Sequence, residues 1–91
     1  MASGKDNLIR RILSKTYKVS VDDGTDLVLT YSHSLIELRQ AMLGAEDLLW
    51  IYDKHKNKLG WMKVNSKTGE ILNYSERDKR IAELVAGEFL G

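Results

Sequence analysis

The hydrophobic and polar positions in the first third of the chain follow two different periods. Apolar residues recur at helical spacing between residues 6 and 14, which predicts a short helix. Residues 17–21 and 27–31 instead alternate with a period of two, which is typical of half-buried strands. The intervening Asp-Asp-Gly-Thr at 22–25 favours a turn, because glycine tolerates positive φ and aspartate bonds to its own backbone. The pattern predicts a β-hairpin whose second strand alternates through Leu27, Leu29 and Tyr31.

A second helix is expected over residues 34–43. Ser34 and Glu37 form a capping-box pattern, in which each side chain would bond to the backbone N–H of the other residue. Gly44 lies where a C-cap glycine belongs. The apolar residues of this segment keep helical spacing at Leu35, Leu38 and Met42.

The middle of the chain predicts three further strands. Residues 48–53 and 59–65 are apolar segments separated by a polar turn at 54–58. Residues 70–74 follow a second turn at 66–69. These three strands would form a meander, with neighbouring strands antiparallel.

The chain ends in a predicted helix that begins after a capping segment at residues 75–78. Gly87 and Gly91 indicate fraying near the end of this helix, since glycine is a poor helix former. One face of the helix is almost wholly apolar and comprises Ile81, Leu84, Val85, Glu88 and Phe89.

The order of the predicted elements is α-β-β-α-β-β-β-α. It predicts an α+β fold with a mainly antiparallel sheet and helices packed on it. We expect one domain over residues 5–91 and a flexible N-terminus over residues 1–4.

Length and composition narrow the function classes. The 91 residues include no cysteine, which excludes disulfides, thiolate metal sites and cysteine nucleophiles. A domain this small has little core to give up for a deep catalytic pocket, and no catalytic constellation is recognisable, so we expect a protein that is not an enzyme and needs no cofactor. No apolar stretch approaches the about 20 residues of a membrane span and no secretory signal is visible, which predicts a cytoplasmic protein without membrane contact.

The charges are segregated although the net charge is only +1. Residues 22–53 contain seven acidic residues and one arginine, whereas residues 54–68 contain five lysines and no acidic residue. Because exposed charges act over only about 8 Å at physiological ionic strength, a basic region can bind a ligand locally in a nearly neutral protein. The simpler interpretation is that the opposite blocks compensate each other as solvated surfaces.

The segment 48–65 provides the candidate site. If it is a hairpin, period-two alternation divides each strand into two faces. The face expected to meet the core holds Leu49, Ile51, Met62 and Val64. The other face combines large aromatic rings with a lysine-rich turn, as in single-strand stacking platforms; protein-binding hot spots use the same aromatic residues. The candidate binding residues are Trp50, Tyr52, Lys54, Lys56, Lys58, Trp61 and Lys63.

Other polar clusters carry weaker signals. The aspartates around Gly24 favour a turn over a cation site, because a calcium loop needs more oxygen ligands and a late glutamate. His33 and His55 are far apart and lack the spacing of a metal motif. We therefore expect His33 to lie at the start of a helix, His55 to be solvated, and no metal to be bound.

Two functions follow from this sequence. The first is a binding or regulatory module that contacts a protein, either a second copy of itself or a foreign partner, through the aromatic sheet face or the C-terminal helix. The second is a single-stranded nucleic-acid-binding protein that uses the lysine-rich turn and the Trp/Tyr face. Both uses of the sheet face would fail if the first or last helix covered Trp50 and Trp61 and made them core residues.

Overall fold

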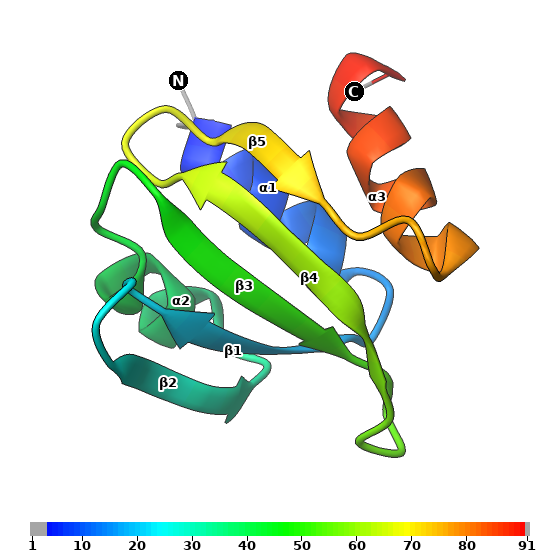
Figure 1. Cartoon of the computed structure of the whole chain (residues 1–91), viewed down its shortest axis with the longest axis horizontal. Coiled ribbons are helices and arrows are strands. Elements are labelled where there is room, and N and C mark those ends of the chain that lie inside the picture. The colour runs from blue at the N-terminus through cyan, green and yellow to red at the C-terminus, as the bar shows by residue number, and fades with distance from the viewer. Residues whose placement is uncertain (1–3, 91) are drawn as a thin grey trace.

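The five strands form one sheet in the order β2-β1-β3-β4-β5, and every neighbouring pair is antiparallel (Figure 1). The computed structural model describes residues 4–90, with the backbone alone at residues 88–90. The predicted α+β fold and element order are confirmed. The elements are α1 (Gly4–Leu13), β1 (Lys18–Asp22), β2 (Leu27–Ser32), α2 (Leu35–Ala41), β3 (Asp47–Tyr52), β4 (Lys58–Asn65), β5 (Glu70–Tyr74) and α3 (Lys79–Leu90).

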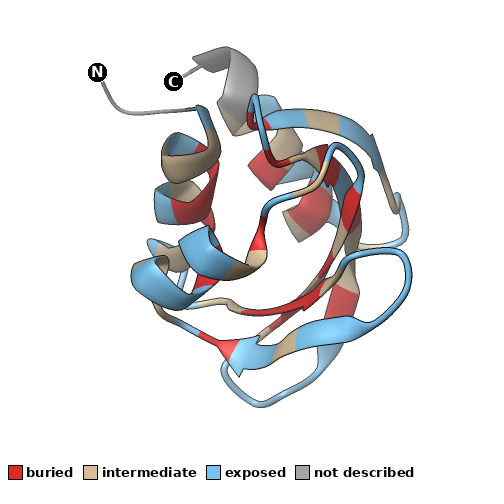
Figure 2. Ribbon diagram, turned by 90° about the vertical axis from the view of Figure 1, so that its left-hand side faces the viewer, coloured by how far each residue is buried: buried red, intermediate tan, exposed pale blue. Residues whose placement is uncertain are grey.

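The helices pack on a single face of the sheet (Figures 1 and 2). The alternate residues of β1, β3 and β4 that point toward them are fully buried, which confirms the core face predicted for β3 and β4. Figure 2 shows these buried positions lining the space between helices and sheet. The side chains that fill this core from the helices are Leu8, Ile9, Ile12, Leu38, Ile81 and Leu84.

The hairpin of β1 and β2 is confirmed, but the simple alternation expected along β2 is wrong. The pairing slips twice, so Leu29 lies opposite Val21 on the core side whereas Leu27 lies opposite Asp22. Tyr31 has a φ of +47°, and its backbone N–H donates to the Ser20 hydroxyl at 3.1 Å. These bulges turn β2 into an irregular edge strand with most of its side chains exposed.

The start of α2 is capped as predicted on one side only. The Ser34 hydroxyl accepts from the Glu37 N–H at 3.3 Å. Glu37 does not reach back to the Ser34 N–H; its carboxylate accepts from the Ser32 hydroxyl, which in turn accepts from the Ser34 N–H, both at 3.2 Å. The predicted glycine C-cap is also wrong, because Met42 ends the helix in an extended conformation and the Gly44 N–H donates to Asp47.

Of the predicted capping segment before α3, the Asp78 carboxylate accepts from the Arg80 N–H at 2.9 Å. Ser75 instead continues the pairing of β5 with β4 through Trp61. Gly87 lies inside α3, where Arg11 of α1 passes close to it. Some of the predictions lie outside the described residues: those on the side chains of Glu88 and Phe89, on Gly91 and on residues 1–3 of the expected flexible N-terminus. Gly4, the last residue of that expected N-terminus, belongs to α1.

Candidate functional site

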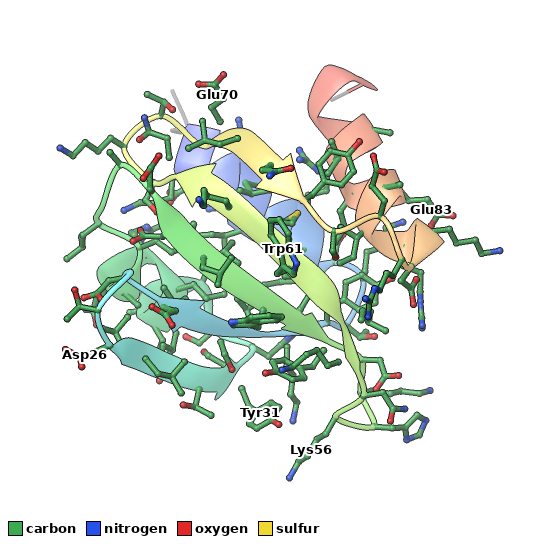
Figure 3. All side chains as sticks on the ribbon, in the orientation of Figure 1. Asp26, Tyr31, Lys56, Trp61, Glu70 and Glu83 are labelled. Atoms are coloured by element: carbon green, nitrogen blue, oxygen red, sulfur yellow. The ribbon has the colours of Figure 1, made fainter. Side chains whose placement is uncertain are left out.

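The face of the sheet opposite the helices carries two tryptophans side by side. Trp50 of β3 and Trp61 of β4 are direct cross-strand partners, and the next pair, Leu49 and Met62, points to the core. Figure 3 shows Trp61 on the near side of the sheet, with the helices behind it. Both tryptophans are half-buried, and within residues 4–90 no helix covers them. The alternative that a helix makes them core residues is therefore wrong.

Lys58 joins this pair because β4 contains a bulge. Strict alternation would place Lys58 with Met62 on the core side, but the register shifts between the pairs of Ile51 and Tyr52. Leu59 thereby enters the core, and Lys58 pairs with Tyr52 on the open side. Its Nζ lies 4.3 Å from the centroid of the Trp50 ring, which is a cation–π contact. The bulge thus places a cation directly on the aromatic surface.

Tyr52 is the predicted site residue that the structure removes from the accessible surface. Only 9% of it is exposed, because the Tyr31 ring packs against it with centroids 4.5 Å apart. Tyr31, which the sequence did not single out, takes the outer position, with Lys56 Nζ 5.8 Å from its ring centroid. The positive φ at Tyr31 is what brings its ring to this face, and the sequence carries no signal for it.

The turn between β3 and β4 is organised by Asp53. Its carboxylate accepts from the backbone N–H groups of His55 and Asn57 at 2.8 and 2.9 Å. The hydrogen bond from the Asn57 backbone is the main reason that the pKa of Asp53 lies below its ordinary value. Lys54 and Lys56 therefore lie at an exposed tip whose backbone is held by an ionised carboxylate. Among the rings that the structure describes, none has Lys54 in a cation–π contact.

A shallow pocket of about 350 Å³ opens beside the tryptophan pair. This volume is at the low end of the range for small-ligand sites. Arg77 reaches it from the loop before α3, and sequence reasoning did not find it because nothing local in the sequence relates that loop to β3. Lys63 lies two residues beyond Trp61 on the same face and is exposed. The pocket is lined by Trp50, Lys58, Leu59, Gly60, Trp61, Ser75 and Arg77.

The other polar candidates have structural partners. Asp22 and Asp23 accept from backbone N–H groups of their own turn at 2.8 Å, as a turn requires. His33 lies just before the cap of α2, with Nδ1 2.9 Å from the Tyr17 carbonyl, and His55 is exposed in its turn. Among the described residues, no three His, Cys, Asp or Glu side chains gather as a metal site would require.

The described helices are too short and too polar to cross a membrane. Comparison of the chain with protein-family models, with curated proteins and with solved structures gives no match. The functional argument therefore depends on the geometry of the open face. We use the name "tryptophan–lysine face" below for the group of Trp50, Lys58, Trp61, Lys63 and Arg77.

Proposed function

We propose that this chain is a non-enzymatic module that binds single-stranded nucleic acid on its tryptophan–lysine face. The observation that carries the proposal is the cross-strand pair of Trp50 and Trp61 on an uncovered sheet face, with Lys58 over the Trp50 ring and Lys63 exposed two residues beyond Trp61. Proteins that bind single strands combine these two elements: aromatic planes on which bases stack, and cations that follow the phosphates.

The contact between Lys58 and Trp50 can be exchanged for a stacked base. A cation–π contact at an exposed site contributes about 0.5–1 kcal/mol, whereas stacking a base on an aromatic side chain contributes about 1–3 kcal/mol. A base that displaces the Lys58 ammonium from the ring would release it within reach of the adjoining phosphate. The stacked base and the new contact between Lys58 and phosphate therefore both favour the bound state.

Lysine is also the reason to prefer nucleic acid over protein as the ligand of this face. Protein–protein interfaces are enriched in tryptophan and arginine but depleted in lysine. Here Lys58 lies on the indole itself rather than at the rim. The C-terminal helix, the other surface considered for a protein partner, uses Ile81 and Leu84 in the core.

The direct test is fluorescence titration of the native chain with a short oligothymidylate at low salt. Stacking on Trp50 or Trp61 is expected to quench the emission, and binding is expected to weaken linearly with the logarithm of salt concentration. The slope should change by about 0.7 for each phosphate neutralised on a single strand. A duplex of the same length should bind more weakly, because its bases are already stacked.

Variants locate the binding on the face, measured by the anisotropy of a labelled oligonucleotide. Trp61→Leu is expected to weaken binding about 5-fold to 150-fold, the equivalent of one stacked base. Lys63→Glu should weaken binding and reduce the salt slope by about 0.7. The matched control is Lys67→Glu, because Lys67 is also exposed but lies in the turn between β4 and β5. An absence of binding at low salt, or equal losses for Lys63→Glu and Lys67→Glu, would contradict the proposal.

A further inference from the structure

The large apolar side chains that remain exposed gather at one edge of the molecule. Leu43 is 67% exposed, Ile36 62% and Leu27 56%, values that are high for residues of this kind. Of the six large hydrophobic residues exposed in the described chain, five belong to β2, to α2 or to the residues just after α2. We call this surface the β2–α2 edge; it comprises Leu27, Val28, Tyr31, Ile36 and Leu43.

The strand and helix parts of this edge are continuous. A shallow pocket of about 460 Å³ is lined by Val28 from β2, Gln40 from α2 and Leu43 just after α2, together with Asp23, Ala41, Gly44 and Asp47. Ile36 precedes Gln40 by four residues and so lies on the same side of α2. Contiguous apolar surface of this kind marks an interaction site, whereas apolar residues that are exposed singly do not.

The strand of this edge also lacks two of the features that prevent association, charge and proline. Residues 27–32 of β2 include no charge and no proline, the residues with which proteins usually protect a sheet edge. The opposite edge strand, β5, begins with the exposed Glu70 (Figure 3). The two bulges in β2 interrupt its backbone ladder. They favour a contact made by side chains over the regular addition of another strand.

The two ends of the edge carry opposite charge. Asp26 lies at the start of β2, and at the other end Lys56 stands over the Tyr31 ring (Figure 3). If a second copy is placed antiparallel along β2 by a twofold axis, Asp26 of each copy faces Lys56 of the other. A parallel arrangement would bring like charges together. The charges therefore favour the antiparallel arrangement, a closed twofold contact in which the same surface is used by both copies.

We propose that a second copy of this chain docks on the β2–α2 edge and forms an antiparallel, twofold dimer. Stable interfaces bury about 800 Å² and about 20–30 residues on each partner, whereas the β2–α2 edge provides five exposed large apolar residues. The dimer is therefore expected to be weak, with a dissociation constant in the micromolar to millimolar range. This surface shares no residue with the tryptophan–lysine face, so either proposal can fail alone.

The test is sedimentation equilibrium of the native chain over a range of concentrations up to about 1 mM, which still detects an association at the weak limit. Val28→Asp places a charge in the centre of the contact and is expected to weaken the dimer at least about 10-fold. The matched control is Leu72→Asp: Leu72 is 41% exposed and Val28 44%, but Leu72 lies on β5 at the other edge. This control should leave the association unchanged.

A charge exchange tests the twofold arrangement. Asp26→Lys and Lys56→Asp should each weaken the dimer, and the double variant should restore it, because both cross-contacts are re-formed with reversed sign. Circular dichroism confirms folding of each variant. A native chain that stays monomeric throughout the range, a loss with Leu72→Asp equal to that with Val28→Asp, or a double variant no better than the singles would overturn the proposal.

Discussion

The two faces of the same strands show what alternation does in this protein. Leu49 and Trp50 are neighbours in β3, yet Leu49 is sealed under the helices and Trp50 lies on the uncovered side. Their cross-strand partners repeat the division, with Met62 in the core and Trp61 outside it. The two-residue alternation of these strands thus places apolar core residues on one side and the two half-buried indoles on the other.

The difference between the faces is a difference in what each side chain contributes to folding. The covered face contacts three helices, and its apolar surface is wholly removed from water. Within residues 4–90 no helix covers the open face, and its rings contact other side chains of the sheet, such as Lys58 over Trp50 and Tyr31 against Tyr52. Substitutions on the two faces should therefore separate stability from binding.

The largest effect is expected from Leu49→Ala compared with Trp50→Ala. Leu49→Ala leaves a cavity in the core and should lower the free energy of unfolding by about 2–5 kcal/mol. Trp50→Ala removes a larger side chain, but one that is only partly buried, and should cost about 1–2 kcal/mol. Urea denaturation followed by circular dichroism measures both. A greater loss for Trp50→Ala would show that the open face is part of the folding core.

The regular strands are where the sequence predicts side-chain direction correctly. The pairing of β3 with β1 has no register shift, so counting by two assigns Leu49, Trp50 and Ile51 to the right faces. Helix positions were also predictable, because an apolar stripe and a capping serine are local signals. The order of the strands is not a local property, since β1 pairs with β3 across the intervening β2 and α2.

The parts of the candidate site that the sequence missed depend on single-residue irregularities. The bulge in β4 exchanges the faces of Lys58 and Leu59, and the positive φ of Tyr31 redirects its ring. An inserted residue of this kind is stabilised by its fit to neighbouring strands rather than by its own sequence. Arg77 was missed for a related reason: the path of the loop after β5 decides where it lies.

A second, smaller effect on stability is expected at two glycine turns. The glycine of one turn contacts helix α1, and the glycine of the other has open space beside it. Gly69, at φ +82°, lies so close to α1 that an added Cβ would fall 2.2 Å from the Gly4 carbonyl carbon. Gly24, at φ +96°, has no atom within 4 Å of such a Cβ. Gly24→Ala should therefore cost only the backbone strain, about 1 kcal/mol, and Gly69→Ala about 1–3 kcal/mol because α1 must also move.

Thermal unfolding of the two glycine variants provides the measurement. The comparison isolates the attachment of α1, because both positions carry the same positive-φ requirement. Equal losses would mean that the turn between β4 and β5 does not hold α1 in place. In either variant the emission of Trp50 and Trp61 should be unchanged, since both turns are remote from the tryptophan–lysine face.

The smallest effect on stability is expected from the ion pair of Asp78 and Arg80 at the start of α3. Hydrogen bonds from the Arg80 side chain, and then from its backbone N–H, lower the pKa of Asp78 from 3.8 to about 2. Because the folded pKa is the lower one, the pair stabilises the protein above about pH 4, and this contribution is lost as pH falls toward 2. Both side chains are partly exposed, so solvent screening keeps this contribution small at neutral pH.

Asp78→Asn tests this contribution, because asparagine keeps a helix cap while removing the charge. The difference in unfolding free energy from the native chain should be constant at neutral pH and should narrow between about pH 4 and pH 2. In an Arg80→Gln background the same substitution should have a smaller effect, since the ion pair is absent and the hydrogen bond from the backbone N–H of residue 80 remains. A pH-independent difference, or one that is undiminished in the Arg80→Gln background, would assign the role of Asp78 to capping alone. The charge at the start of α3 would then contribute nothing to the stability of the protein. The attachment of α3 to the sheet would depend on the apolar burial of Ile81 and Leu84.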